Sequence, residues 1–211
     1  MSTIKIRRIQ NLTNAEADKI TAMLVRAYED NTAVPAMVGG NDELRDLLFR
    51  SMVRAGGLEG DLKVVEDEEG NIFSIALWFR PGVNMWGTEE QRRLGYNEFM
   101  AKLDPDTVKW WKEDYAQATT DFIKQWLPVP RVDTWWLNVL GTDPVHQRKG
   151  YASMLLADTL KTVKGPTTLA FCTTTEENAE FYEHAGFPIR GRTVISSKHG
   201  NILVVGHSRN M

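Results

Sequence analysis

Two apolar segments joined by one helix constrain the fold of this chain more than any other feature. Residues 135–142 read Trp-Trp-Leu-Asn-Val-Leu-Gly-Thr, a near-continuous apolar run that is typical of a strand covered on both faces. A helix with inward Leu155, Leu156 and Leu160 follows, and Gly165 and Pro166 end it. Residues 168–173 then form a second short apolar segment. A strand, a helix and a strand in this order predict two parallel strands joined by a right-handed crossover.

Weaker patterns place further elements around this unit. Thr13 and Glu16 form a capping box that begins a helix, and Gly56 and Gly57 are expected to end the next helix. The other predicted strands are 4–9, 62–66, 72–79, 192–196 and 202–207, and the other predicted helices are 13–29, 42–55, several within 89–126, and 176–185.

These elements predict an α/β (α+β) fold, in which helices flank a mixed, centrally parallel twisted sheet. A length of 211 residues suits a single domain over 1–211. The tryptophan-rich helical stretch at about 84–130 is predicted to be an insertion before the strand at 135–142. Residues 31–40 have no clear periodicity, and whether they or the insertion act as a lid stays open.

Composition excludes several classes of function. The formal net charge of −3 argues against a nucleic-acid partner. No run approaches the roughly 18 apolar residues of a membrane span, and the first residues lack the apolar core of a signal peptide, so we expect a cytoplasmic protein without a membrane partner. The single cysteine, Cys172, and four dispersed histidines match no metal-ligand spacing, so we expect no metal. Cys172 is expected to be a buried structural residue.

A candidate phosphate-binding loop follows the strand at 135–142. Gly150 and the small Ala152 let a ligand approach the backbone closely. Free amides at the start of the next helix, together with the helix dipole, favour an anion there. Arg148 and Lys149 add positive charge at the rim. The spacing matches neither a P-loop nor a Rossmann fingerprint, so the predicted ligand is a pyrophosphate held in another way.

Two motifs in this region resemble the GNAT superfamily of acetyltransferases. The first is Gln147-x-x-Gly150-x-Ala152, and the second runs from Asn178 through Tyr182 to Gly186 and Phe187. The resemblance covers residues 135–187 and implies a GNAT fold and an N-acetyltransferase that uses acetyl-CoA as cosubstrate. The residues that it implies for coenzyme binding are Leu140, Gly141, Thr142, Gln147, Arg148, Lys149, Gly150, Tyr151, Ala152, Ser153 and Asn178.

The resemblance also implies a mechanism in which the amine attacks the thioester directly, without a covalent enzyme intermediate. Tyr182 is the residue that matches the general acid, because a phenol with a pKa near 10 stays protonated at neutral pH. Some members carry a carboxylate base where this sequence has Trp136. Asp133, Glu66 and a water held by Asn138 are the alternatives that remain, and the base stays unassigned.

The acceptor is expected to be the primary amine of a small molecule, because a bulky aromatic insertion favours an enclosed pocket. Two alternatives remain: a protein or peptide acetyltransferase that modifies a lysine or an N-terminus, and a non-catalytic module that binds acyl-CoA. Asn178 binds near the coenzyme in the family, and it can equally cap the helix that it opens. The sequence leaves open the acyl chain length and the choice between a monomer and a homodimer.

Overall fold

A single mixed sheet forms the centre of the molecule in the computed structural model, which describes residues 3–211. The strand order is β1-β2-β3-β4-β5-β7-β6. Within this sheet β4 and β5 run parallel, and the other neighbouring pairs are antiparallel. The strands are β1 Lys5–Arg8, β2 Asp61–Glu66, β3 Ile72–Phe79, β4 Trp135–Thr142, β5 Thr168–Thr173, β6 Ile189–Ile195 and β7 Ile202–Asn210. The predicted mixed sheet is confirmed, and its parallel part is one central pair.

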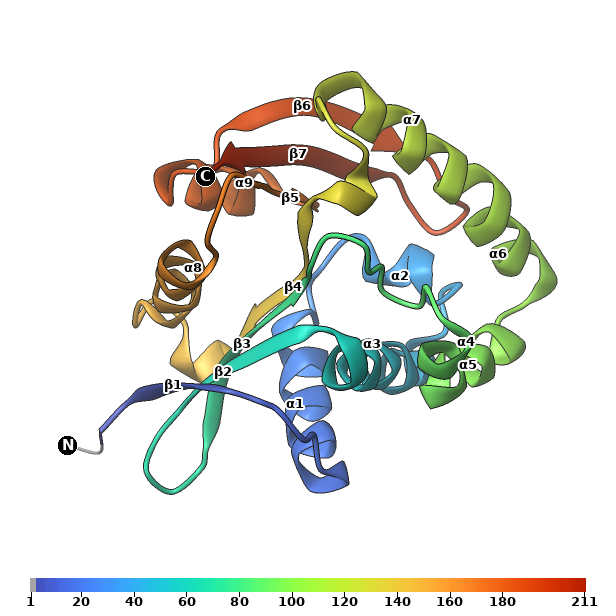
Figure 1. Ribbon diagram of the computed structural model, residues 1–211. Helices are drawn as coiled ribbons and strands as arrows, with labels where there is room; N and C mark the ends of the chain where they lie inside the picture. Colours follow the sequence, from blue (N-terminus) through green and yellow to red (C-terminus); the bar gives the residue numbers. More distant parts are fainter. Residues whose placement is uncertain (1–2) are drawn as a thin grey trace.

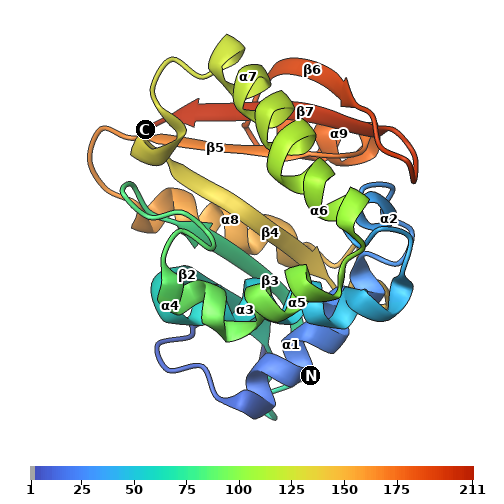
Figure 2. The same ribbon diagram turned by 90° about the vertical axis from the view of Figure 1, so that its right-hand side faces the viewer.

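The parallel pair β4 and β5 is joined only at one end. Among the described residues, the ladder consists of Trp135 with Leu169 and Trp136 with Ala170. Beyond Trp136 the two strands separate, and the sheet divides into a β1–β4 half and a β5–β7 half (Figure 2). Helix α8, Tyr151–Thr162, makes the predicted crossover between them. The sheet therefore contains a gap that opens toward the carboxyl ends of β4 and β5, which is where α/β sheets commonly bind ligands.

Helices cover both faces of the sheet. On one face lie α1, Asn14–Ala27, and α3, Arg45–Glu59, and on the other lie α8 and α9, Glu176–His184 (Figure 1). The core divides in the same way. Val139 of β4 packs in the cluster of α1 and α3, whereas Leu137 of the same strand packs with Leu155 and Leu156 of α8. A ligand in the gap would thus meet one layer of helices on each side.

The predicted insertion is helical and crosses the face that carries α1 and α3. It consists of α4 Glu89–Gln91, α5 Asn97–Lys102, α6 Pro105–Trp110 and α7 Ala116–Trp126, with two wide turns at Arg92–Tyr96 and Trp111–Tyr115. The last helices run beside β6 and β7 (Figures 1 and 2). Gly191 and Gly206 let α7 lie close to these strands, because a Cβ at Gly206 would collide with the indole of Trp126. The insertion therefore closes one side of the β5–β7 half.

Two local predictions were wrong or incomplete. Gly56 and Gly57 do not end a helix, because α3 continues to Glu59. They are needed for close packing instead, since a Cβ at either position would meet the side chain of Leu77 or Leu12. The segment 31–40, which has no periodicity, contains the short helix α2, Val34–Met37.

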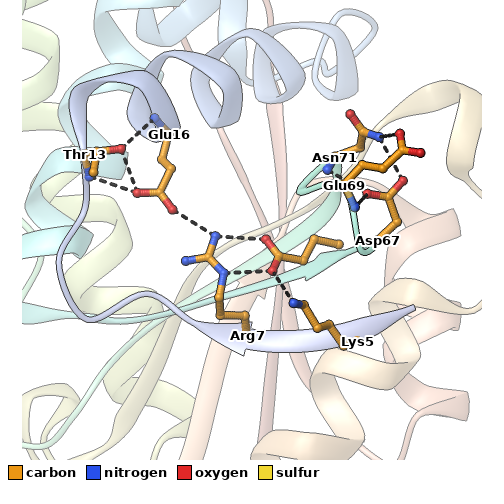
Figure 3. Close-up of polar contacts among 8 residues, drawn as sticks. Lys5, Arg7, Thr13, Glu16, Asp67, Glu69 and Asn71 are labelled. Atoms are coloured by element: carbon orange, nitrogen blue, oxygen red, sulfur yellow. Dashed lines mark hydrogen bonds and ion pairs between the residues drawn. The ribbon is translucent and has the colours of Figure 1, made fainter. Parts of the chain in front are cut away.

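An ion-pair network fixes the edge strand β1 (Figure 3). Arg7 donates two hydrogen bonds of 2.9 Å to the carboxylate of Glu66 on β2 and one of 2.9 Å to Glu16 on α1. Glu16 also completes the predicted capping box with Thr13, and Lys5 lies 3.5 Å from Glu66. The Glu66 carboxylate is thus occupied by Arg7, which also binds α1 through Glu16, and it lies two strands away from the gap.

Candidate active site

The backbone of β4 presents polar groups to the gap. The Asp143 N–H donates to the carbonyl of Phe73 on β3 at 2.9 Å, so alternation along the chain turns Leu140 and Thr142 toward the gap and Gly141 toward β3. Two contacts agree with this direction. The Leu140 carbonyl accepts a hydrogen bond of 3.1 Å from the Tyr28 hydroxyl, and the Thr142 carbonyl accepts one of 3.4 Å from Gln147 Nε2. The N–H groups of Leu140 and Thr142 are thereby left facing the open gap.

Gly141 has no side chain, and this absence allows close packing between β4 and α1. A Cβ at this position would lie 2.6 Å from Leu24 Cδ2 on α1. The glycine therefore lets α1 pack directly on β4, and it brings Tyr28, which caps the end of α1, to the Leu140 carbonyl.

The loop between β4 and α8 has the geometry of an anion cradle. Arg148 and Gly150 have left-handed φ values of 60° and 82°, and a Cβ at Gly150 would meet nothing within 4 Å. No side chain of the described residues caps α8, and Met154 N–H is bonded to the Gly150 carbonyl at 2.9 Å. The amides before it, in Tyr151, Ala152 and Ser153, form the first turn and point out of the helix. Free amides, a helix dipole and open space suit a pyrophosphate, so the residues present fit acetyl-CoA.

Positively charged and polar side chains surround this cradle. Gln147, Arg148 and Lys149 are exposed, and Lys149 Nζ lies 3.2 Å from His146 Nδ1. An ion pair between Arg26 of α1 and the buried Asp143 fixes the start of the loop. The sequence gives no sign of this pair, because its members are far apart along the chain.

Tyr182 lies on α9 and is buried, with its ring centroid 4.4 Å from that of Phe171. Burial raises the pKa of Tyr182 far above its usual range, and the nearby Tyr28 raises this pKa further. Burial also raises the pKa of Tyr28 to about 12, against the opposing effect of its hydrogen bond to Leu140. Tyr28 packs in the core on the α1 face and Tyr182 in the core on the α9 face. Two protonated phenols thus approach the gap from its opposite sides.

Asn178 is exposed on the first turn of α9 and does not cap it. The cap is Thr175, whose hydroxyl accepts a hydrogen bond of 3.2 Å from the Asn178 N–H. The Asn178 side chain is therefore free of that task and faces solvent.

The three alternatives for the base lie in different surroundings. Glu66 is held by Arg7 outside the gap. Asp133 is exposed just before β4. Asn138 lies where the β3–β4 register shifts, since Leu77 pairs with Val139 and Trp78 with Leu137. Its Oδ1 is buried without a hydrogen-bond partner among the described residues, so it is an acceptor that a ligand N–H or a water can satisfy.

The described part of the chain, residues 3–211, contains no metal-binding cluster and no membrane-spanning helix. No three His, Cys, Asp or Glu residues in this range gather in a group that suits a metal ion. None of the helices described there has both the length and the apolar character that crossing a membrane requires.

Comparisons with known proteins agree with this geometry. The sequence model of the acetyltransferase (GNAT) family matches residues 72–187. Comparison with curated proteins finds none that matches. A solved structure from Corynebacterium glutamicum, named histone acetyltransferase HPA2 and related acetyltransferase, is similar over 99% of this chain and 96% of its own at 19% identity, with a TM-score of 0.64.

Two more solved structures have the same fold. The yncA protein of Salmonella typhimurium, a putative acetyltransferase solved with acetyl-CoA, is 12% identical over 98% of this chain and 93% of its own, with a TM-score of 0.51. A mosquito arylalkylamine N-acetyltransferase-like protein is 13% identical over 99% of this chain and 100% of its own, with a TM-score of 0.61. The family match extends over more than half of the chain and includes β3, β4, α8, β5 and α9. The chain therefore belongs to the GNAT acetyltransferase family and is an acetyl-CoA-dependent acyltransferase.

Proposed function

We propose that the protein transfers the acetyl group of acetyl-CoA to the primary amine of a small molecule. The observation that carries this proposal is the closure of the face opposite α8 and α9. There the Trp111 indole donates a hydrogen bond of 2.8 Å to the Met37 carbonyl on α2, and the Trp110 indole donates one of 2.8 Å to the Ser196 carbonyl after β6. These contacts tie the insertion to α2 and to the β6–β7 turn.

An enclosed acceptor side favours a small amine over a peptide. A peptide needs an extended groove for the residues on both sides of the modified amine. The contacts of Trp110 and Trp111 bridge this face and would interrupt such a groove, whereas a compact amine does not need one. The name of the mosquito protein, arylalkylamine N-acetyltransferase-like 5b, is consistent with this class, whereas that of the Corynebacterium glutamicum protein includes a histone acetyltransferase. The contacts of the insertion, and not these names, carry the proposal.

The residues of the α8 side hold the coenzyme in this proposal. The amides of Tyr151, Ala152 and Ser153 bind the pyrophosphate, and Gly150 keeps the approach open. Gln147, Arg148 and Lys149 bind at the rim of the cradle, and Asn178 does so from α9. The bound acetyl-CoA supplies an activated acetyl thioester to the gap.

The residues of the gap act on the reacting groups. The Leu140 and Thr142 N–H groups donate hydrogen bonds to the acetyl and pantetheine oxygens, which stabilises negative charge on the acetyl oxygen. The Tyr182 hydroxyl donates a hydrogen bond to the leaving sulfur, and its raised pKa keeps this donor protonated. CoA leaves as the thiol when the proton passes to sulfur, and solvent returns a proton to the phenol. The amine attacks directly, and no side chain forms a covalent bond to the acetyl group.

Removal of the amine proton is assigned to water in this proposal. The unpartnered Oδ1 of Asn138 binds either the amine N–H or a water that takes the proton. Because a neutral amide is a poor base, turnover is expected to rise with pH as the acceptor loses its own proton.

The test measures free CoA thiol released from acetyl-CoA at mildly alkaline pH, with a panel of small amines and a few basic peptides. The wild type is compared with Gly150→Glu, which adds a carboxylate to the cradle. Gly165→Glu is the matched control, because Gly165 has the same φ of 82°, is equally exposed, and lies beyond the other end of α8.

Turnover of a small amine that is lost in Gly150→Glu and kept in Gly165→Glu supports the proposal. Turnover of peptides alone would replace it with a protein acetyltransferase. Acetyl-CoA binding by calorimetry without turnover of any acceptor would indicate a non-catalytic binding module.

A further inference from the structure

Arg131 is an arginine whose side chain has no polar partner in the described structure. It lies in the short turn Arg131–Asp133, directly before β4. Its guanidinium carbon is 4.5 Å from the ring centroid of Trp136, so the planar group stacks over the indole. Burial lowers the pKa of Arg131 from its ordinary value of 12.5. Burial also raises the pKa of the nearby Tyr115 and of Cys172 to about 12, so neither carries a negative charge that could pair with Arg131 at neutral pH.

The lack of a partner is unusual for a charge in this position. Within residues 3–211 no carboxylate lies within ion-pair distance of Arg131 and no acceptor takes a hydrogen bond from its side chain, and Nε is completely buried. By contrast, Arg7 and Arg26 are paired with Glu66 and Asp143. Arg131 as a whole is half-buried. Stacking on Trp136 offsets part of the cost of burying Nε, but it leaves the Nε–H without an acceptor. The two terminal nitrogens are not fully buried and can donate to a ligand.

The guanidinium lies on the side of the sheet from which the amine must come. Trp136 packs with Leu127 and Ala170 in a cluster next to α7, whereas its neighbour Leu137 packs with α8 on the opposite face. The pyrophosphate cradle belongs to α8, so the coenzyme enters from that face and the acceptor from the face of Arg131.

The guanidinium also lies at the closed end of the gap. Trp136 and Ala170 form the last pair of the β4–β5 ladder, and the gap begins immediately beyond them. Asn138, with its unpartnered acceptor, is the second residue after Trp136 on the same strand. The closed end of the gap therefore has a guanidinium without an ion-pair partner on the α7 side and, where β4 bulges at Asn138, a buried acceptor without a hydrogen-bond partner.

We propose that Arg131 binds a carboxylate of the acceptor, so that the substrate is a small molecule with both a primary amine and a carboxylate. This inference rests on the proposed function. The fork of a guanidinium matches the two oxygens of a carboxylate, and the Trp136 ring holds the fork in one plane. The amine end is then directed along β4, toward Asn138 and the gap.

The test uses matched sets of acceptors that differ only at the carboxylate. Each set contains an amino acid, its amide and its decarboxylated amine, for example phenylalanine, phenylalaninamide and phenethylamine, and the sets cover acidic, basic, aliphatic and aromatic side chains. The wild type is expected to prefer the carboxylate in kcat/KM by about 10- to 100-fold, the value of a charged hydrogen-bonded pair. Arg131→Met is expected to lose this preference, and Arg131→Lys to keep part of it.

A second measurement separates binding from a purely structural role. If Arg131 were needed for packing on Trp136, Arg131→Met would lower the melting temperature. We expect a melting temperature that is equal or higher, because Arg131→Met removes a charge without an ion-pair partner together with a buried Nε–H that has no acceptor. We also expect sodium acetate to stabilise the wild type more than sodium chloride of equal ionic strength, and this difference to vanish in Arg131→Met. Arg80→Met, which removes an exposed arginine at the end of β3, is the matched control for net charge and should keep the difference.

The outcomes distinguish this inference from the proposed function. A carboxylate preference that disappears in Arg131→Met supports both. Turnover of the decarboxylated amines with equal or greater kcat/KM, or a preference that survives in Arg131→Met, overturns the role of Arg131 and leaves the proposed function intact. Turnover of peptides alone, or of no acceptor, overturns both.

Discussion

The Tyr28 hydroxyl donates a hydrogen bond of 3.1 Å to the Leu140 carbonyl, inside the gap between β4 and β5. The bond connects the end of α1 to β4. It also holds a phenol with a pKa of about 12 next to Tyr182, which approaches from the other side of the sheet. Tyr28 also contributes to the raised pKa of Tyr182. The role of each hydroxyl can be tested by replacement of the tyrosine with phenylalanine.

Tyr28→Phe is expected to lower the free energy of unfolding by about 0.5–1.5 kcal/mol, the usual value of one internal hydrogen bond. The ring is retained, so its packing on Phe49, at a centroid distance of 5.1 Å, should persist. Urea denaturation of both proteins gives the difference. An unchanged free energy of unfolding would mean that solvent replaces the hydroxyl at Leu140 without loss.

Tyr182→Phe is expected to lower kcat by about 10²- to 10⁴-fold, the usual effect of removing a general acid. The phenylalanine ring retains the packing on Phe171, so the substitution removes only the hydroxyl group that donates to the leaving sulfur. The dissociation constant of acetyl-CoA, measured by calorimetry, should stay close to that of the wild type, because the cradle on α8 is separate from this ring. Unchanged turnover would remove Tyr182 from the mechanism.

The pH profile of the wild type provides a further check on Tyr182. Burial raises the pKa of its phenol above the usual range, so the acid stays protonated as pH increases. Turnover should rise as the amine is deprotonated and should not fall through tyrosine ionisation below about pH 10, the reference value. A decline that begins well below that pH and is absent in Tyr182→Phe would contradict the raised pKa.

The features that could be predicted from the sequence are those encoded within a few neighbouring residues. Thr13 and Glu16 form the predicted capping box, and Gly150 has the left-handed conformation that a close approach to the loop favours. The strand–helix–strand order around α8 is enough to predict the parallel pair β4–β5, because a crossover connection of this kind is right-handed and joins parallel strands of one sheet.

The features that could not be predicted depend on contacts between distant parts of the chain. Gly56 looks like a helix end in sequence, but Leu77 of β3 occupies the space that its Cβ would need. Tyr28 and Arg131 carry no motif, and their positions follow only from the packing of α1 and of the insertion against β4. The sequence thus predicts the local conformation of the loop before α8, whereas the surroundings of Tyr28 and Arg131 follow only from contacts between distant segments.

Glu66→Gln is expected to lower the free energy of unfolding by about 1–2 kcal/mol at neutral pH, because it removes a charged acceptor of Arg7, with solvent at Arg7 screening part of the effect. The Arg7 hydrogen bonds hold the pKa of the Glu66 carboxyl below its ordinary value of 4.5. A lowered pKa in the folded state means that the contribution is complete above about pH 4.5 and is lost as pH falls through the folded pKa.

The difference between the wild type and Glu66→Gln should therefore shrink as urea denaturation is repeated below pH 4.5. Glu68→Gln is the control, because Glu68 is exposed in the turn that follows and loses the same charge. A difference that is equal at neutral and acidic pH would show that Glu66 acts through packing and not through its charge.

Gly206→Ala is expected to displace α7 from the sheet. The new Cβ would lie 2.6 Å from Cζ2 of the Trp126 indole, and a rigid ring on a helix can relieve such a contact only if the helix moves. The expected cost in the free energy of unfolding is about 1–3 kcal/mol, as for other overpacked sites. Because α7 covers the acceptor side, KM for the amine should rise, whereas the acetyl-CoA dissociation constant should stay unchanged.

Trp126→Leu is the control background, because it removes the obstructing ring. In that background Gly206→Ala should lower the free energy of unfolding by less than it does in the wild type. An equal loss in both backgrounds would assign the effect to β7 itself.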